Sequence, residues 1–152
     1  MEQTDEDLNG ILDYEFKRVK EQKLEEYGIT IKLEKENDFT KWIVTLIAPE
    51  DSDYKGAKYE VLVEFKNDYP YNNPEFTFRS KIYHCNVDNE GKLKVNWLMR
   101  GMKIDYILPR LLTLFYIQDD TDEKDEKCKL HKENIEEFKE NIRINVKENP
   151  NK

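Results

Sequence analysis

The residues of this chain best suited to nucleophilic or metal chemistry are its two cysteines and two histidines. Cys85 directly follows His84, and Cys128 precedes His131 at a spacing that resembles a pair of zinc ligands. Adjacent side chains such as His84 and Cys85 chelate one ion poorly, so we expect no metal site and no cofactor. Either cysteine can instead serve as a small apolar residue, and we favour this interpretation for both.

A longer pattern surrounds His84 and extends well upstream of it. It comprises, in chain order, Trp42, Ala48-Pro49, Tyr54-Lys55-Gly56, Tyr69-Pro70 with Pro74, Lys81-Ile82-Tyr83-His84, Asn86, and the run from Gly91 to Leu98. In order and spacing, these marks resemble those of the ubiquitin-conjugating enzymes, over roughly residues 5–147. No single mark is decisive, but together they are specific.

The resemblance implies a chemistry that needs a cysteine which this chain lacks. In the family, one cysteine shortly after a His-Pro-Asn turn carries ubiquitin as a thioester, because a thiolate is both a good nucleophile and a good leaving group. Lys94 stands at that position, and Cys85 replaces the proline of the turn. The resemblance assigns Asn86 to the asparagine that stabilises an oxyanion, and His84 to the residue that holds the turn. Without the thiol Asn86 has no oxyanion to stabilise, so we favour a turn-fixing role for it as well.

The resemblance also assigns residues that would meet the reacting lysine or other proteins. The loop carboxylate that orients the incoming lysine corresponds to Asp125 or Glu126. Tyr71 matches the aromatic loop residue through which the family commonly contacts ubiquitin ligases. The basic positions that face the activating enzyme, which equally suit the C-terminal end of a helix, are Lys17, Arg18 and Lys20.

Lys94 leaves three interpretations open. We favour a non-catalytic variant that binds ubiquitin, a ubiquitin-like protein or an active conjugating enzyme, because an amine forms a stable isopeptide rather than a thioester. The second is an active enzyme in which a cysteine at this position was deliberately replaced to trap a conjugate. The third is an active enzyme whose nucleophile has moved to Cys85. A scaffold domain of the RWD type is a further alternative, but it does not explain Lys81-Ile82-Tyr83-His84.

Hydrophobic periodicity predicts the elements that position these residues. Helical spacing of apolar residues predicts a helix over 4–22, with Thr4 as its cap. Alternating apolar residues then predict four strands, at 29–33, 42–46, 57–65 and 76–78. A helix followed by strands at hairpin spacing indicates an α+β fold with an antiparallel sheet.

The second half of the chain is less regular. Residues 79–103 have no clear period, and so long an irregular stretch is typically functional. Apolar residues over 108–116 predict a buried helix with Pro109 in its first turn. A final helix is expected from Lys129 onward, and residues 148–152 are expected to form a frayed tail. The resemblance implies the same layout: a single UBC-like domain over 1–152, with a four-stranded meander and two or more C-terminal helices.

Composition narrows the partners and the compartment. With 25 Lys and Arg against 33 Asp and Glu, the net charge is -8, which disfavours nucleic acid as a partner. No apolar run approaches the length that spans a membrane, and the N-terminus has no apolar signal segment. Two cysteines are too few for a disulfide framework, so we expect a reducing compartment: the cytoplasm, the nucleus or both.

Overall fold

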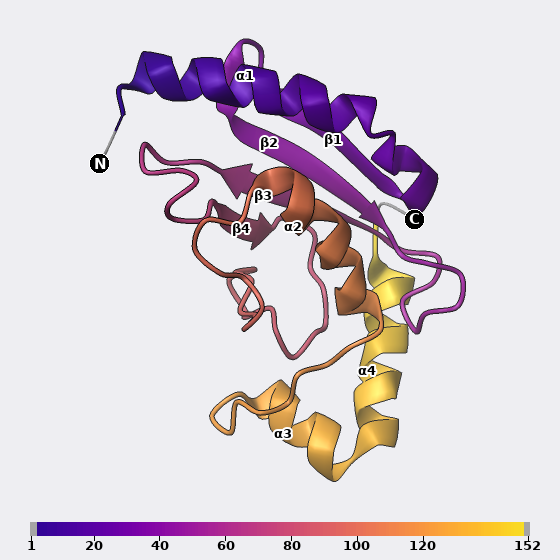
Figure 1. Ribbon diagram of the computed structural model, residues 1–152. Coiled ribbons are helices and arrows are strands. Elements are labelled where there is room, and N and C mark those ends of the chain that lie inside the picture. The colour runs from indigo at the N-terminus through magenta and orange to yellow at the C-terminus, as the bar shows by residue number, and fades with distance from the viewer. Residues whose placement is uncertain (1–2, 151–152) are drawn as a thin grey trace.

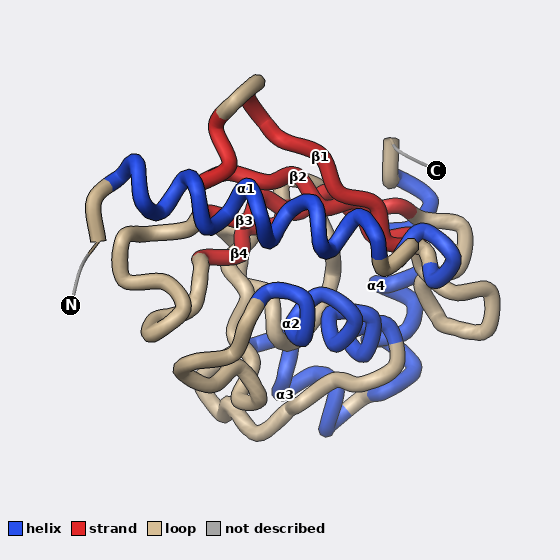
Figure 2. The backbone as a smooth tube through the Cα atoms, turned by 45° about the horizontal axis from the view of Figure 1, so that its top comes forward, coloured by secondary structure: helices blue, strands red, loops and turns tan. Residues whose placement is uncertain are grey.

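The computed structural model describes residues 3–150 and arranges them around an antiparallel sheet (Figure 1). The elements are α1 (Asp5–Glu21), a 3₁₀ turn (Leu24–Tyr27), β1 (Ile29–Lys35), β2 (Asp38–Ile47), β3 (Lys58–Glu64), β4 (Glu75–Phe78), α2 (Ile104–Arg110), a 3₁₀ helix (Leu111–Phe115), α3 (Glu126–Glu133) and α4 (Ile135–Glu148). In Figure 1, α1 and α3 lie at opposite ends of the molecule, and in Figure 2, α2 again lies between them. None of the helices within residues 3–150 is long and apolar enough to cross a membrane.

The first helix begins where its capping residue predicts. The Oγ1 of Thr4 accepts a hydrogen bond from the backbone N–H of Asp7 at 3.1 Å, which satisfies one of the amide groups that lack a partner at a helix start. On its inner side Leu8, Leu12 and Val19 are buried and join the hydrophobic core. The predicted N-terminal helix and its cap are therefore confirmed.

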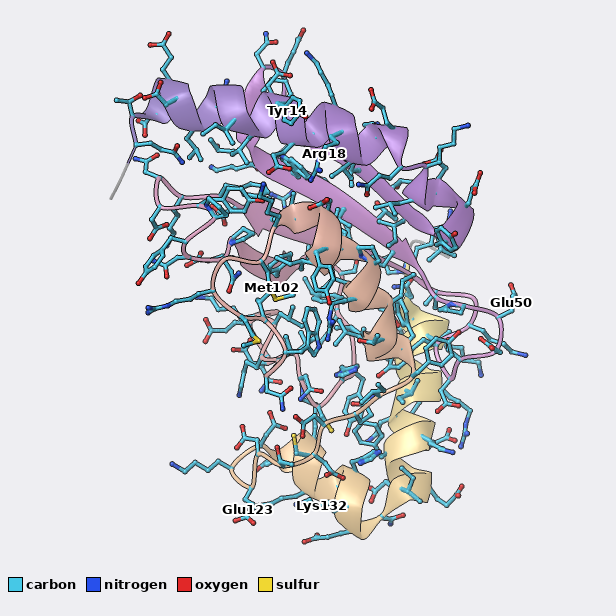
Figure 3. The ribbon with its side chains drawn as sticks, in the orientation of Figure 1. Tyr14, Arg18, Glu50, Met102, Glu123 and Lys132 are labelled. Carbon is cyan, nitrogen blue, oxygen red and sulfur yellow. The ribbon has the colours of Figure 1, made fainter. Side chains whose placement is uncertain are left out.

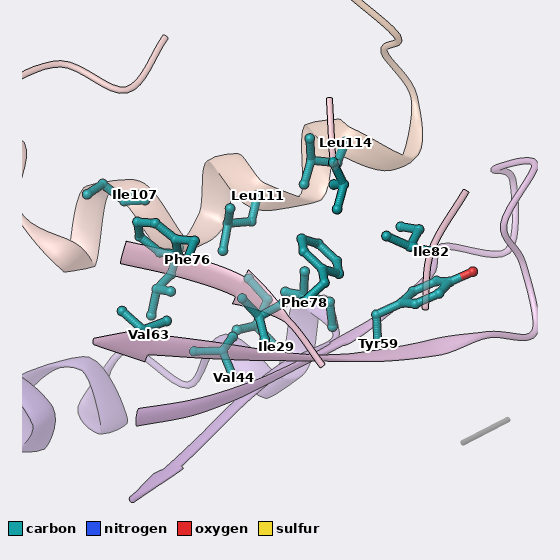
Figure 4. Packing of buried hydrophobic residues seen from close by; sticks show 14 of the residues in the cluster. Ile29, Val44, Tyr59, Val63, Phe76, Phe78, Ile82, Ile107, Leu111 and Leu114 are labelled. Atoms are coloured by element: carbon teal, nitrogen blue, oxygen red, sulfur yellow. The ribbon is translucent and has the colours of Figure 1, made fainter. Parts of the chain in front are cut away.

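The four predicted strands are present and form a meander in the order β1-β2-β3-β4. The register sets Val44 opposite Val61, and Val61 opposite Phe78. Because alternate side chains of a strand point to the same side, one face of the sheet is apolar across all four strands. This face packs against Ile107 of α2 and Leu111 of the 3₁₀ helix (Figure 4). The predicted α+β arrangement is confirmed.

α2 begins earlier than its apolar pattern predicted. It starts at Ile104, because Ile104 and Ile107 are also buried on its inner side. Pro109 therefore lies near the end of α2 and not in its first turn, so that prediction was wrong. A proline lacks an N–H and its ring crowds the carbonyl four residues earlier. The α-helix accordingly gives way to the 3₁₀ helix at Leu111.

The C-terminal region contains two helices where a single final one was expected. Asn134, with φ -149° and ψ 81°, separates α3 from α4, and its side chain caps the start of α4. Beyond α4, the buried Asn149 is bonded through its side-chain amide to both the N–H and the C=O of Lys58, at 3.3 and 2.9 Å. The prediction of a frayed tail is wrong for Asn149, whose contacts are with a strand far away in sequence. Residues 151–152 of that tail lie outside the described residues.

The irregular segment over 79–103 is held against the sheet by a close backbone approach. The N–H of Phe78 donates to the carbonyl of Gly91 at 2.7 Å, next to an isolated bridge between Thr77 and Lys92. Gly91 has a φ of +86°, and a Cβ at this position would lie 2.3 Å from the carbonyl oxygen of Phe78. Only glycine fits here, because the backbone of β4 occupies the space of a side chain.

Replacing this glycine should be costly. We expect Gly91→Ala to lower the free energy of unfolding by about 3 kcal/mol, and Gly56→Ala by about 1 kcal/mol. Both glycines have positive φ, but nothing lies within 4 Å of a Cβ built at Gly56. Only Gly91→Ala therefore adds a steric clash to the backbone strain. Chemical denaturation measures both losses, and equal losses would show that the approach to Phe78 does not constrain the segment.

Candidate active site

The turn at His84 is fixed by a buried imidazole. The Nδ1 of His84 accepts a hydrogen bond from the N–H of Asn86 at 2.9 Å, so its Nε2 carries the proton and donates to the carbonyl of Leu114 at 2.7 Å. The ring is fully buried. Burial lowers the pKa of His84 to about 4, and the ring is therefore neutral at neutral pH. This geometry suits the turn-holding role that the sequence suggested.

Asn86 joins the turn to the loop that follows the 3₁₀ helix. Its Nδ2 donates to the carbonyl of Asp119 at 2.9 Å, and its Oδ1 accepts from the N–H of Asp119 at 3.0 Å. The side chain is thus held by two hydrogen bonds to the backbone of one residue. Such a fixed side chain stabilises the turn, and this structural role is the one we favour over that of an oxyanion donor.

Gln118 accepts a hydrogen bond that a proline at position 85 could not donate. The backbone N–H of Cys85 donates to Oε1 of Gln118 at 2.8 Å, and Nε2 of Gln118 donates to the hydroxyl of Tyr54 at 2.8 Å. That hydroxyl in turn donates to the carbonyl of Tyr83. Sequence reasoning missed Gln118. The sequence did contain a signal for it: Cys85 stands where the family has a proline, so the turn gains a buried N–H, and a buried N–H requires an acceptor.

Lys94 lies next to the turn, where it lines a pocket of about 290 Å³. Its backbone N–H donates to the carbonyl of Asn86 at 2.7 Å, which fixes where its side chain starts. Its ammonium lies 3.5 Å from Oδ2 of Asp122, and 47% of the Lys94 side chain is exposed. The reactive group that this position presents to solvent is therefore an amine.

Asp122 is the carboxylate that the structure places beside Lys94, although the sequence pointed to Asp125 or Glu126. Asp125 instead caps α3, where its side chain accepts two backbone N–H bonds, and Glu126 is exposed in the first turn of that helix. The N–H of Lys124, and secondly Lys94, lower the pKa of Asp122. A count along the sequence cannot find Asp122, because loop length is free to vary where no period constrains it.

Both cysteines are buried and lie close together. Cys85 is 2% exposed, Cys128 is fully buried, and the thiol of Cys128 lies 3.5 Å from the carbonyl oxygen of Cys85. Burial raises the pKa of both thiols, which disfavours the reactive thiolate. A nucleophile must reach the thioester of another protein, so this position counts against Cys85 in that role. The Nδ1 of His131 lies 2.7 Å from Oδ2 of Asp120, so the partner of this imidazole is a carboxylate.

The basic residues named on α1 differ in what they contact. Lys17 and Lys20 are exposed. Arg18 instead lies between α1 and α2 (Figure 3), where its guanidinium is 2.5 Å from Asp105 and 3.4 Å from Glu15. Arg18 therefore links the two helices, while Lys17 and Lys20 remain the candidates for contact with another protein.

Tyr71 is available at the surface. Its side chain is 60% exposed, and the guanidinium of Arg100 stacks 5.2 Å from the centre of its ring. Arg100 also donates to the Tyr71 hydroxyl at 3.1 Å. The cation–π contact and the hydrogen bond give the ring a defined orientation. Its role as a ligase contact stays a prediction.

Comparison with known proteins identifies the family of this chain. The family model described as ubiquitin-conjugating enzyme matches residues 11–146, which include the turn, Lys94 and the loop with Asp122. The chain belongs to the ubiquitin-conjugating enzyme family. The family resemblance predicted from the sequence is confirmed. Lys94 lies within the region that the family model matches.

Individual relatives agree with the family assignment. The ubiquitin-conjugating enzyme E2 of African swine fever virus (isolate Pig/Kenya/KEN-50/1950) is 28% identical over 88% of this chain and 68% of its own length. The protein named Probable ubiquitin-conjugating enzyme E2 7 of Caenorhabditis elegans is 37% identical, over 47% of this chain and 43% of its own. A crystal structure assigned to the ubiquitin conjugating enzymes, from Plasmodium yoelii, has a TM-score of 0.79 at 24% identity and covers 93% of this chain and 94% of that one. This structural match confirms the predicted UBC fold.

The buried His84 should make stability depend on pH. Its pKa is 6.5 in the unfolded chain and about 4 in the folded protein, so protons bind preferentially to the unfolded state between these values. Its contribution is fully present above pH 6.5, falls as the pH drops from 6.5 to 4, and amounts to about 3 kcal/mol. In NMR titrations of the folded chain, the His84 ring signals should keep the chemical shifts of a neutral imidazole down to pH 5. The variant His131→Gln assigns these signals. Titration near 6.5 would contradict this account of the turn.

The two thiols should be protected in the folded protein. We expect a chromogenic disulfide reagent to modify Cys85 and Cys128 at least about 100-fold more slowly in the native chain than in denaturant, because burial hides both and raises their pKa. Cys85→Ser and Cys128→Ser separate the two rates. A native thiol that reacts as fast as free cysteine would return Cys85 or Cys128 to the list of candidate nucleophiles.

Proposed function

We propose that this chain is a non-catalytic member of the family, which binds ubiquitin, a ubiquitin-like protein or an active conjugating enzyme. One observation carries the proposal: Lys94 presents an exposed ammonium, paired with Asp122 at 3.5 Å, where the chemistry of the family needs sulfur. An amine that attacks a thioester expels the thiol and forms an amide. The amide is too stable to pass the modifier to another lysine.

The surroundings of Lys94 support a protein that keeps its shape without the thiol. The hydrogen bonds of His84 and Asn86, and the backbone bond of Lys94, do not involve the Lys94 side chain. The fold can therefore persist whether a cysteine or a lysine occupies position 94. Binding surfaces that do not need the thiol, such as the one around Tyr71, persist with it.

The partner should come from the same pathway. Ubiquitin-conjugating enzymes act together with ubiquitin, activating enzymes and ligases, and this chain shares their fold over nearly all of its length. A protein of this shape that forms no thioester can still occupy the same contacts. Through them, it would bias which lysine an active conjugating enzyme modifies.

An active enzyme with cysteine at position 94 is the second candidate. The observation that favours it is the backbone bond from Lys94 to Asn86, which a cysteine would retain. Against it, Cys85 replaces the proline of the turn, and 102–105 replace the Trp-Ser-Pro-Ala segment that helps the family bind ligases. We therefore expect Lys94→Cys to transfer ubiquitin weakly or not at all.

Charging assays test the proposal. After incubation with activating enzyme, ATP and ubiquitin, we expect no adduct on gels run with or without reductant, because neither buried thiol is reachable and the ammonium of Lys94 is paired with Asp122. NMR titration with ubiquitin, and separately with an active conjugating enzyme, should shift backbone amide signals of this chain with at least one of them. Absence of shifts with both would contradict the binding role.

The variants separate the alternatives. A reducible adduct that is lost in Cys85→Ser would overturn the proposal in favour of a relocated nucleophile. A non-reducible adduct that is lost in Lys94→Arg, but kept in the matched control Lys92→Arg, would identify Lys94 as a trap. Lys92 is exposed two residues from Lys94, so it controls for a general effect of lysine replacement. Robust discharge from Lys94→Cys to free lysine would support the second candidate.

A further inference from the structure

A larger cleft lies between residues 78–91 and α4, and the proposed function does not use it. Its volume is about 750 Å³, within the range of small-molecule sites, and it shares no lining residue with the pocket at Lys94. Apolar side chains make up part of its surface. Ile82 and Val87 are buried, Tyr83 is partly buried, and Ile144 of α4 is 46% exposed.

An ammonium without a carboxylate partner lines this cleft. Lys127, in the first turn of α3, is half-buried, and its Nζ donates to the carbonyl of Val87 and lies 6.0 Å from the centre of the Tyr83 ring. None of the ion pairs within residues 3–150 involves Lys127. An ammonium has three N–H groups, so this one retains donors for a ligand. Burial lowers the pKa of Lys127, as expected for a charge held away from water.

Several other charged side chains line the cleft, and most of them are exposed. Lys81 and Arg79 are exposed cations of the cleft, and Arg79 is already paired with Glu34. Asp88 already accepts two backbone N–H bonds with one carboxylate oxygen, each at 2.9 Å. Glu90 and Glu148 are exposed, so water and salt screen their charges. Lys127 is therefore the charge in this cleft that a bound anion would compensate most strongly.

We propose that this cleft binds a small organic acid, with a flat apolar body against Tyr83 and Ile144 and its acidic group on Lys127. Burial of the apolar body provides affinity, and a charge-assisted hydrogen bond provides orientation. Lys127 also bonds the carbonyl of Val87, the residue after Asn86. The ligand would thus bind at a lysine that supports the active-site turn, whether or not Lys94 is catalytic.

A matched pair of ligands tests the charge. The probe is 2-naphthoate, and naphthalene-2-methanol is its neutral control. In NMR titrations of the full chain, 2-naphthoate should give saturable shifts that cluster around Tyr83, Val87 and Ile144. The neutral alcohol should bind at least about 10-fold more weakly. Dispersed or non-saturable shifts, or equal affinities for the two ligands, would overturn the proposal.

A matched pair of variants tests the residue. Lys127→Gln should weaken 2-naphthoate binding by about 10-fold and leave the alcohol unaffected. Lys124→Gln, which replaces an exposed lysine of the preceding loop, should change neither affinity. Unchanged 2-naphthoate affinity in Lys127→Gln would refute the role of this lysine. If Lys127→Gln does not fold, the two ligands on the unaltered chain still decide the question.

Discussion

The hydrogen bonds of one buried imidazole hold together parts of this protein that share no helix or strand. The ring of His84 connects the carbonyl of Leu114, near the end of the 3₁₀ helix, with the N–H of Asn86 in the turn. Each buried polar group left without a partner would cost about 1–3 kcal/mol. Residues 79–103 form almost no strand pairs, so side chains must supply those partners. Gln118 and Asn86 continue the network into the following loop.

This network fixes the position of residue 94 without fixing its identity. The contact from Lys94 to Asn86 is made by backbone atoms, and the Lys94 side chain extends toward solvent and Asp122. A thiol can therefore be exchanged for an amine with little effect on packing, although the chemistry changes completely. Such a separation would allow members of a family to share a fold while differing in activity.

The sequence predicted the elements whose pattern repeats. The helix after Thr4 and the first three strands each carry several apolar residues at one spacing, so one aberrant residue does not hide them, and the short fourth strand shows the same alternation in Phe76 and Phe78. The predictions for Pro109 and Asn149 were wrong because tertiary contacts determine their positions. Burial of Ile104 extends α2 toward the N-terminus, and Asn149 forms hydrogen bonds with the backbone of Lys58.

The site was predicted only in part, for a related physical reason. His84 and Asn86 lie in a contiguous motif, and the structure gives both a role in holding the turn. Asp122 and Gln118 reach the site from a loop whose length no pattern constrains. The link from Arg18 to Asp105 likewise depends on how two distant helices pack. Contacts of this kind become visible only once the fold is known.

Whether the amine at position 94 ends thioester chemistry can be measured most directly by intact-protein mass spectrometry. The unaltered chain would be mixed with activating enzyme, ATP and ubiquitin, and its mass recorded under non-reducing conditions. If Lys94 has removed the activity, the chain keeps its free mass. A ubiquitin adduct on the unaltered chain that a reductant removes would show that a thiol still carries the modifier, and would contradict the non-catalytic assignment.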